Sequence, residues 1–423
     1  MALRGAHVWD ELVGQEAAVE ILRGAALGAR GLVDGEHAHA SVDPSQADCT
    51  SADPSDYDID SAGDDISRAM SHAWLITGPP GSGRSVAARA FAAVLQCTEA
   101  DMGAGHCPGC ITTMNGSNAD VHLVATEASV ISVDTARSLV LQAQSAPSQG
   151  RWRVIIVEDA DRLTEAGANA LLKAIEEPPA RTVWLLCSPS PEDMITTIRS
   201  RCRHLGLRIP SVEAVADLLV SEGVSDRQTA ISAARTAQSH IGLARALAKD
   251  PEMRERRRQI MTAPVRVRSV GEAVFAAENL LKTAQAQADA QTLERNAREK
   301  AALLRQLGMD ESERPDRQQR VMLKQLEDDQ KRRSKRALTD ALDRALVDLL
   351  AIYRDVLMVQ LGTGQQLVNG DLEDVVHELA SDSTPRQTMG RVAAIEEARK
   401  RLISNGQALL VLEAMAVSLR PQA

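Results

Sequence analysis

The sequence predicts an α/β domain whose parallel sheet is covered by helices on both faces, followed by two all-helical regions. A glycine-rich loop, TGPPGSGRS (77–85), lies between the apolar run AWLIT (73–77) and the helical pattern SVAARAFAAVLQC. Two further apolar runs, VIIV (154–157) and TVWLLCS (182–188), alternate with helical patterns. Such alternation is typical of parallel α/β sheets. Strand patterns then stop at about residue 208.

The composition is that of an ordinary globular protein. Hydrophobic residues make up 44% of the 423 residues and charged residues 25%. Aromatic residues make up 2%, which argues against a protein that binds RNA or single-stranded DNA by base stacking. The six cysteines are too few for a disulfide framework, and we find no signal core or apolar run of membrane-spanning length. We therefore expect a soluble, cytoplasmic protein without membrane contact.

The formal net charge of −10 comes from one segment. Residues 31–67 contain ten Asp and Glu residues and no Lys or Arg, so the rest of the chain is formally neutral. Any contact with DNA would have to come from a local basic patch or from a partner. The stretch from about 35 to 68 is rich in Asp, Ser, Ala and Pro and lacks the apolar residues that a core needs. We predict a disordered insertion there.

Helical patterns fill most of the remaining chain. Residues 8–30 predict a short entry and an amphipathic helix, and residues 211–249 predict three short helices. Two long charged helices are expected at about 270–307 and 318–361. Their charges do not follow a clean heptad, so a helical bundle is favoured over a coiled coil.

The loop TGPPGSGRS has the spacing of a phosphate-binding loop in the strand–loop–helix context that such a loop requires. Gly78, Gly81 and Gly83 let backbone N–H groups turn toward a phosphate, and Ser85 is placed to hold the Mg²⁺ of ATP. Arg84 replaces the usual lysine, and a planar guanidinium is not a conservative substitute for a compact ammonium. The loop is therefore predicted to be a degenerate site that binds ATP weakly or as a structural ligand.

The acids that follow the strand at 154–157 stand in an unusual order. Such a strand usually ends in Asp, which holds the metal, and then Glu, which orients the attacking water. Here Glu158 precedes Asp159. The metal-side carboxylate is thus one methylene too long and the water-side one too short, and a shift of about 1 Å costs roughly a hundredfold in rate. Arg84 in place of lysine and the reversed order of Glu158 and Asp159 are independent features, and both predict weak ATP hydrolysis.

Four motifs give the chain a family resemblance, and in order they are LVGQE (12–16), GPPGSGRS (78–85), NALLKAIEEPP (169–179) and IRSRC (198–202). With them the chain resembles the bacterial clamp-loader ATPases of the AAA+ class over about residues 8–250. The part of the resemblance most specific to this family is LLKAIEEPP, followed about twenty residues later by SRC. The chain looks most similar to the member of the loader ring that hydrolyses almost no ATP itself.

The resemblance implies an AAA+ P-loop domain at 1–207 with a cysteine knuckle at 97–110, a helical lid domain at 208–255 and a helical collar domain at 256–423. The collar closes a five-subunit ring. The implied partners are the delta and tau/gamma subunits and, through the complex, the sliding clamp and primed DNA. The complex is part of the DNA polymerase III holoenzyme, a DNA-directed DNA polymerase.

In this family each nucleotide lies between two subunits, and the arginine of the SRC motif reaches into the neighbour's site. That residue is Arg201, flanked by Ser200 and Cys202. A trans arginine stabilises transition-state charge and can raise the rate by about 10³–10⁵. The family's sensor positions are partly kept: Pro189 supplies no donor after the strand at 182–188, whereas Arg245 matches the arginine that the lid places on the nucleotide.

The resemblance also implies a zinc module after the P-loop helix. Cys97, Cys107 and Cys110 are three of the expected cysteines, and Ala104 stands where the remaining one is expected. His106 is the candidate fourth ligand of a Cys₃His site, although it is adjacent to Cys107. Bound zinc and a degenerate knuckle with free thiols both stay open.

Two hypotheses for the function follow. The first is a non-hydrolysing ring subunit that supplies Arg201 in trans. The second is an active motor subunit of the tau/gamma type, in which Arg84 is a tolerated variant. ATP hydrolysis by the isolated chain distinguishes them. A DNA-binding structural protein is a third reading, which the neutral body of the chain and its few aromatic residues disfavour.

Overall fold

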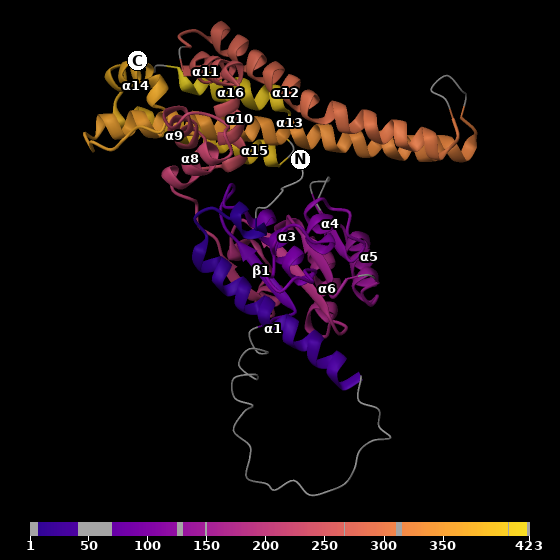
Figure 1. The fold of residues 1–423 in the computed structure, drawn as a ribbon. Helices are drawn as coiled ribbons and strands as arrows, with labels where there is room; N and C mark the ends of the chain where they lie inside the picture. Colours follow the sequence, from indigo (N-terminus) through magenta and orange to yellow (C-terminus); the bar gives the residue numbers. More distant parts are fainter. Residues whose placement is uncertain are drawn as a thin grey trace, which may run out of the picture. The chain divides into compact units, whose positions relative to one another are not determined.

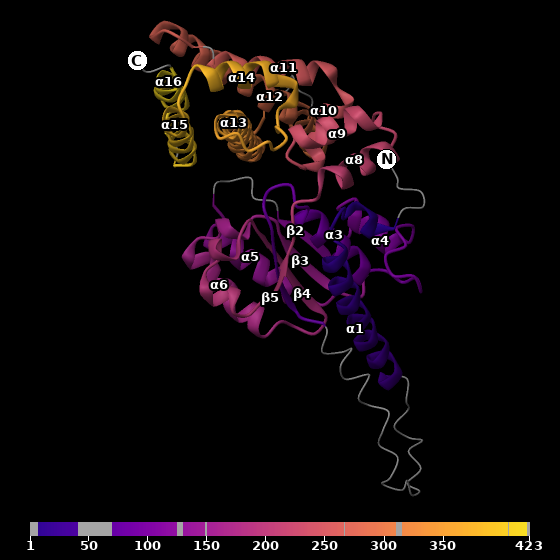
Figure 2. The ribbon, with the colours of Figure 1, turned by 90° about the vertical axis from the view of Figure 1, so that its left-hand side faces the viewer.

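The computed structural model describes residues 7–40, 70–124, 130–148, 150–265, 267–309, 315–404 and 406–420. The chain divides into two compact units, Met1–Leu218 and Leu219–Ala423. The first is an α/β unit and the second is built from helices (Figures 1 and 2). Helix α1 continues to Ala40 and so includes the first residues of the insertion predicted at about 35–68. From residue 41 onward the predicted insertion lies outside the described residues.

The first unit is organised around a parallel sheet of five strands in the order β2-β3-β4-β1-β5. The strands are β1 (Ala73–Thr77), β2 (Val121–Val124), β3 (Arg153–Val157), β4 (Thr182–Ser188) and β5 (Arg203–Gly206). The three central strands, β1, β3 and β4, are buried along their whole length and confirm the three predicted strands. The two edge strands, β2 and β5, were not predicted.

Helices cover both faces of this sheet, as predicted. The helices of the first unit are α1 (Glu16–Ala40), α3 (Arg84–Leu95), α4 (Pro108–Met114), α5 (Val133–Ala143), α6 (Glu165–Glu176) and α7 (Thr196–Arg199), with α8 (Val212–Ser221) at the division between the units. Successive strand residues point to opposite faces. Trp74 therefore packs edge-on against Phe91 of α3, with ring centroids 5.5 Å apart, whereas Trp184 packs on the other face and its Nε1 donates to the Ala174 carbonyl of α6.

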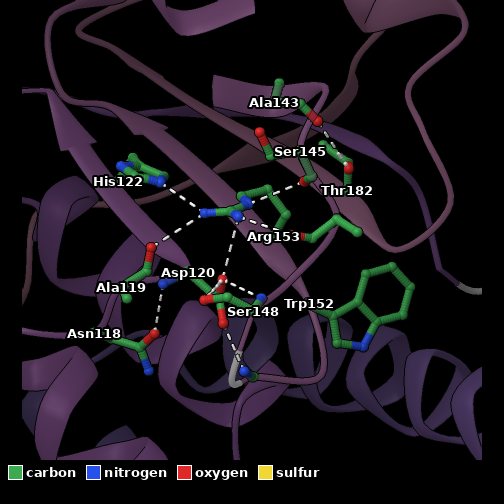
Figure 3. A network of polar contacts seen from close by, with 12 residues as sticks. Asn118, Ala119, Asp120, His122, Ala143, Ser145, Ser148, Trp152, Arg153 and Thr182 are labelled. Atoms are coloured by element: carbon green, nitrogen blue, oxygen red, sulfur yellow. Dashed lines mark hydrogen bonds and ion pairs between the residues drawn. The ribbon is translucent and has the colours of Figure 1, made fainter. Parts of the chain in front are cut away.

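A buried ion pair fastens the amino ends of β2 and β3 (Figure 3). Asp120 is fully buried, and one of its carboxylate oxygens lies 3.3 Å from Nη2 of Arg153, whose side chain is 7% exposed. Asp120 also accepts from the backbone N–H groups of Ser148 at 2.7 Å and Gly150 at 2.6 Å. Arg153 donates in turn to the carbonyl of Ala146 at 2.8 Å. The pair thus anchors the loop between α5 and β3, away from the strand ends that carry the glycine-rich loop.

Within its described residues the second unit contains helices and no strand. It contains α9 (Arg227–Thr236), α10 (Ile241–Lys249), α11 (Pro251–Val265), α12 (Val270–Gln306), α13 (Arg317–Gln360), α14 (Glu373–Ser381), α15 (Pro385–Ile403) and α16 (Ala408–Leu419). The three short helices and both long helices are confirmed to within a few residues. The separate lid and collar domains stay a prediction. Among the described helices, none combines the length and the apolarity that crossing a bilayer requires.

Candidate functional site

The glycine-rich loop connects β1 to α3 at the carboxyl end of the sheet. Gly83 is the N-cap of α3 and has φ 89°, a left-handed conformation that glycine adopts without strain. A Cβ at Gly78 would lie 2.5 Å from the Ser82 hydroxyl oxygen and 2.9 Å from the Leu207 carbonyl oxygen, so no larger residue fits there. The loop therefore keeps the backbone turn and the helix N-terminus that cradle a phosphate.

Arg84 uses its charge inside this loop. Its Nη1 donates to the carbonyl oxygen of Gly78, at the start of the loop, and the residue is half-buried. Because the guanidinium donates to the Gly78 carbonyl within the same loop, it does not extend toward a phosphate as a free charge. Ser85, the predicted Mg²⁺ ligand, occupies the first turn of α3 and is also half-buried.

The glycine-rich loop and the predicted acids follow the carboxyl ends of β1 and β3, which both pair in parallel with β4. Burial raises the pKa of the Cys187 thiol in that strand to about 12, and the charges of Arg84, Glu158 and Asp159 all act on it, the first lowering the pKa and the other two raising it. Burial also raises the pKa of Asp161 above its usual value. The structure thus brings together the loop and both acids that the sequence assigned to one site.

The end of β4 offers little to a γ-phosphate. The Ser188 hydroxyl donates to the carbonyl of Ser190 at 2.8 Å, and Ser188 is fully buried. Pro189 follows and has no backbone N–H. This position therefore provides no available donor.

Gln15 is a positioning residue that the sequence reasoning missed. Its side chain is buried, and its Nε2 donates to the carbonyls of Ser82 at 3.3 Å and Arg208 at 2.6 Å. Its Oε1 accepts from the backbone N–H of Arg208 at 3.2 Å. One amide thus ties the glycine-rich loop to the chain that leaves β5. Gln15 belongs to LVGQE, so the motif contained the signal, although its contacts lie far along the chain.

The SRC motif follows α7 and presents one charged group. The Nε of Arg201 donates to the carboxylate of Glu176, and its Nη1 donates to the Thr197 carbonyl at 2.9 Å. The Arg201 side chain is 38% exposed. Ser200 is exposed and donates its hydroxyl hydrogen to the Thr197 carbonyl at 3.2 Å, whereas burial raises the pKa of Cys202 to about 12. Only the arginine of the three is thus a charged group at the surface. No sequence signal identified Glu176 as its partner.

Arg245, the predicted second sensor, lies on α10 in the second unit. Its Nε and Nη2 donate to the two carboxylate oxygens of Glu222 at 2.8 Å and 2.6 Å. This fork-to-fork geometry is the strong form of an Arg–carboxylate pair. Glu222 therefore fixes the orientation of the guanidinium within its own unit.

The three knuckle cysteines converge. The Sγ atoms of Cys97, Cys107 and Cys110 all lie within 4.8 Å of one another, and all three residues are buried. Burial raises the pKa of Cys107, but hydrogen bonds such as the one from the backbone N–H of Cys110 outweigh it, so the net pKa lies below its usual value. His106 is exposed and lies outside this cluster. Three convergent thiols fit three ligands of a tetrahedral zinc site, and the part of the chain that the structure describes supplies no fourth.

Comparisons with known proteins find similar sequences among subunits of DNA polymerase III. Residues 65–211 match the family described as DNA polymerase III, delta subunit. The delta prime subunit of DNA polymerase III from Bacillus subtilis is 26% identical over 357 residues, which cover 83% of this chain and 91% of that protein. The delta prime subunit from Escherichia coli is 34% identical over 42% of this chain and 54% of its own length.

The gamma/tau subunits are similar over a shorter region. The gamma/tau subunit of DNA polymerase III from Mycobacterium tuberculosis is 37% identical over 143 residues, which cover 33% of this chain. The chain spans only 25% of that relative's length. Among solved structures, a gamma subunit-related protein of Thermotoga maritima aligns with 78% of this chain and 95% of its own, at 17% identity and a TM-score of 0.32.

Proposed function

Because this chain belongs to the clamp-loader family of DNA polymerase III that includes the delta prime and gamma/tau subunits, we propose that it acts as a delta prime subunit. In this role it hydrolyses little ATP itself and completes the nucleotide site of a neighbouring subunit. One contrast in the first unit carries the proposal. Arg84 is bound to Gly78 inside its own loop, whereas Arg201 lies at the surface.

The chain's own nucleotide site is weak in this proposal. Arg84 would have to break its bond to Gly78 before it could reach a phosphate, and a guanidinium matches the lysine position poorly. Glu158 and Asp159 stand in the reverse of the productive order. ATP with Mg²⁺ then binds weakly or as a structural ligand held by the loop N–H groups and Ser85.

Arg201 does its work in the neighbour's site. There a water molecule attacks the γ-phosphorus of ATP, the bond to the β–γ bridging oxygen breaks, and ADP and phosphate leave. Negative charge develops on the bridging and γ-phosphate oxygens, and the guanidinium donates hydrogen bonds to it. In that position the Nε of Arg201 keeps the carboxylate of Glu176, and the terminal guanidinium nitrogens donate to the phosphate oxygens.

The proposed partners follow from the family. The chain would dock the delta subunit on one side and a tau/gamma subunit on the other in a five-subunit ring. Through this complex it would help to load the sliding clamp on primed DNA in the cytoplasm. The 26% identity with a delta prime subunit, extending over 83% of this chain, supports these partners.

We also propose that the cysteine knuckle holds one zinc ion. Cys97, Cys107 and Cys110 would be its protein ligands. Bound zinc would supply a structural crosslink rather than chemistry. The loop that zinc would fix also contacts the segment before α1, because the backbone N–H of Val8 donates to the Gly103 carbonyl at 2.9 Å.

A second candidate is a motor subunit of the tau/gamma type. The observation that favours it is the 37% identity with gamma/tau subunits over 143 residues. ATP hydrolysis by the isolated chain separates the two candidates, since a motor hydrolyses ATP with its own Ser85, Glu158 and Asp159. Turnover by the isolated chain on the order of 1 s⁻¹ would favour the motor.

The decisive experiment compares Arg201→Ala with Arg199→Ala in a reconstituted loader whose neighbouring subunit is the one competent for hydrolysis. Arg199 is the matched control, since it is exposed, lies two residues away and donates to the Pro191 carbonyl at 3.4 Å. We expect Arg201→Ala to slow single-turnover ATP hydrolysis by about a thousandfold or more, and Arg199→Ala to leave it unchanged. Equal rates for wild type and Arg201→Ala would refute the proposal.

A further inference from the structure

The second unit carries a two-helix extension, which we call the arm and define as residues 285–306 of α12 and 317–340 of α13. The buried core of the helical unit ends at Ala284 on α12 and begins at Ala341 on α13. Beyond these residues the two helices run side by side past the other helices of the unit (Figure 1). The arm therefore exposes most of its surface to solvent.

Charged groups on the inner side of the arm hold its two helices together. The Arg333 side chain is only 12% exposed, and its Nη1 donates to Asn296 Oδ1 and to Glu299 Oε2, both at 2.8 Å. Burial raises the pKa of Glu299, but hydrogen bonds from Arg333 and Arg295 outweigh this effect and bring the pKa below its usual value. These charges are used for packing within the arm.

The outer side of α13 is different. It carries five exposed basic residues that repeat at intervals of three, four or seven positions and therefore lie on one side of the helix. We call this set the basic face, and its members are Arg317, Arg320, Lys324, Lys331 and Lys335.

The middle of the basic face lies between Lys324 and Lys331. Among the described residues, no carboxylate forms an ion pair with Lys324 or Lys331, although Glu327 stands four positions before Lys331. The acids between them are partly occupied, since Asp329 pairs with Arg332. Exposed pairs of this kind contribute only about 0.2–0.5 kcal/mol, so phosphates can replace them easily.

A second run of basic residues, on α11 of the same unit, serves packing within that unit. Four arginines at 254–258 of α11 all have partners. Arg254 donates to the Leu247 carbonyl, and the others pair with acids: Arg256 with Asp250, Arg257 with Asp348 and Arg258 with Asp374. That run is used for packing, so basic density alone does not explain the exposed lysines of the arm.

We propose that the basic face binds the phosphate backbone of duplex DNA without reading its sequence. Lysine and arginine neutralise phosphates and release counterions, which supplies most of non-specific affinity. The sequence from 285 to 340 contains no Phe, Tyr or Trp, so the arm lacks the stacking platforms that single-stranded nucleic acid uses. From Arg317 to Lys335 the face spans about 27 Å at 1.5 Å per residue, most of one turn of duplex at about 34 Å.

The test measures binding of the purified full chain to a fluorescent duplex of about 30 base pairs by anisotropy, between about 50 and 200 mM salt. The variant combines Lys324→Glu, Lys331→Glu and Lys335→Glu. We expect its affinity to fall at least about tenfold and the slope of log affinity against log salt to shrink by about 2.7, since each lost phosphate contact contributes about 0.9. Circular dichroism establishes that the variant is folded.

The control combines Lys249→Glu, Lys282→Glu and Arg386→Glu, which are exposed in the same unit, lie off the arm and change the net charge equally. It is expected to bind duplex within about threefold of wild type. Equal losses in both variants, or no binding by the wild type, would overturn the proposal. So would a wild type that ignores duplex but binds a synthetic peptide of the acidic residues 41–69, because the face would then take an acidic protein segment. None of these outcomes depends on Arg201, so failure here is distinct from failure of the trans arginine.

Discussion

The carboxylate of Glu176, the last residue of α6, binds the guanidinium of Arg201, which follows α7. This contact joins the runs LLKAIEEPP and SRC, the two sequence motifs that most specifically suggest the family. The pair is about 40% exposed on each side, at 38% for Arg201 and 43% for Glu176. Water screens such a pair, so it contributes little to stability. Its proposed value is orientation, because it sets the direction from which Arg201 leaves the surface.

Glu176→Gln is therefore expected to slow hydrolysis in the neighbouring site while leaving the fold unchanged. Loss of the carboxylate lets the guanidinium sample other orientations, and a misplacement of about 1 Å costs on the order of a hundredfold. We expect about a ten- to hundredfold loss in single-turnover rate, with a change in unfolding free energy below about 1 kcal/mol. Glu177→Gln, one residue further on and also exposed, is the control. A normal rate for Glu176→Gln would show that Arg201 orients itself.

Arg84→Lys should strengthen nucleotide binding without producing a working ATPase. The substitution removes the bond to the Gly78 carbonyl and restores the compact charge that a phosphate-binding loop normally presents. We expect ATP to bind about tenfold more tightly, measured by calorimetry, because a charged hydrogen bond is worth about 1.5–3 kcal/mol. Hydrolysis should stay absent because Glu158 and Asp159 are unchanged. Arg89→Lys, on the same helix, is the control, and equal affinity in wild type and Arg84→Lys would contradict the expectation.

Asp120→Asn is expected to destabilise the first unit strongly. The change removes the charge that compensates Arg153, which is 7% exposed, and breaking a buried pair from one side costs about 3–5 kcal/mol. Urea unfolding measures the loss. Asp134→Asn serves for comparison because its pair with Arg137 is exposed on both sides and its loss should cost below about 1 kcal/mol. Similar losses for the two variants would mean that the buried network contributes no more than a surface pair.

Zinc content tests the cysteine knuckle. We expect about one zinc per chain by plasma mass spectrometry, and its loss in Cys107→Ser, because three thiolates are the protein ligands proposed. Zinc should also dissociate as the pH falls, since protons compete with the metal for thiolates. Cys187→Ser, whose thiol is buried in β4 away from the cluster, should keep its zinc. A wild-type chain that is metal-free after purification in zinc-containing buffer would indicate free thiols.

The central architecture could be predicted because burial leaves a direct trace in the sequence. Strands β1, β3 and β4 are buried on both faces and appear as continuous apolar runs. The edge strands leave a weaker trace. In β5, Arg203, His204 and Gly206 are exposed and only Leu205 is buried, so its four residues read as a polar loop. Helix α14 was missed as well, since its nine residues follow an irregular polar stretch.

The site could be predicted only as far as its motifs reach. The glycine-rich loop, Glu158 and Arg201 stand in recognisable local patterns. The contacts that these residues make with Glu176 and Gln15 do not follow from those patterns, because each of the two partners comes from a distant part of the chain. Glu176 lies 25 residues before Arg201, and Gln15 lies 193 residues before Arg208. Only the folded sheet brings such pairs into contact, so a local sequence pattern does not predict which residues pair.

Helix α13 is one uninterrupted rod of 44 residues that begins in the arm and ends in the packed core around Tyr353. At 1.5 Å per residue it is about 66 Å long, and about 35 Å of it lies in the arm. Because α13 is one continuous helix anchored in the core, a tilt at the core displaces its far end. A tilt of about 10° at the core moves the far end by about 6 Å on this geometry. Small repacking around Tyr353 would therefore displace the distal end of α13 by about 6 Å, close to the pitch of one helical turn.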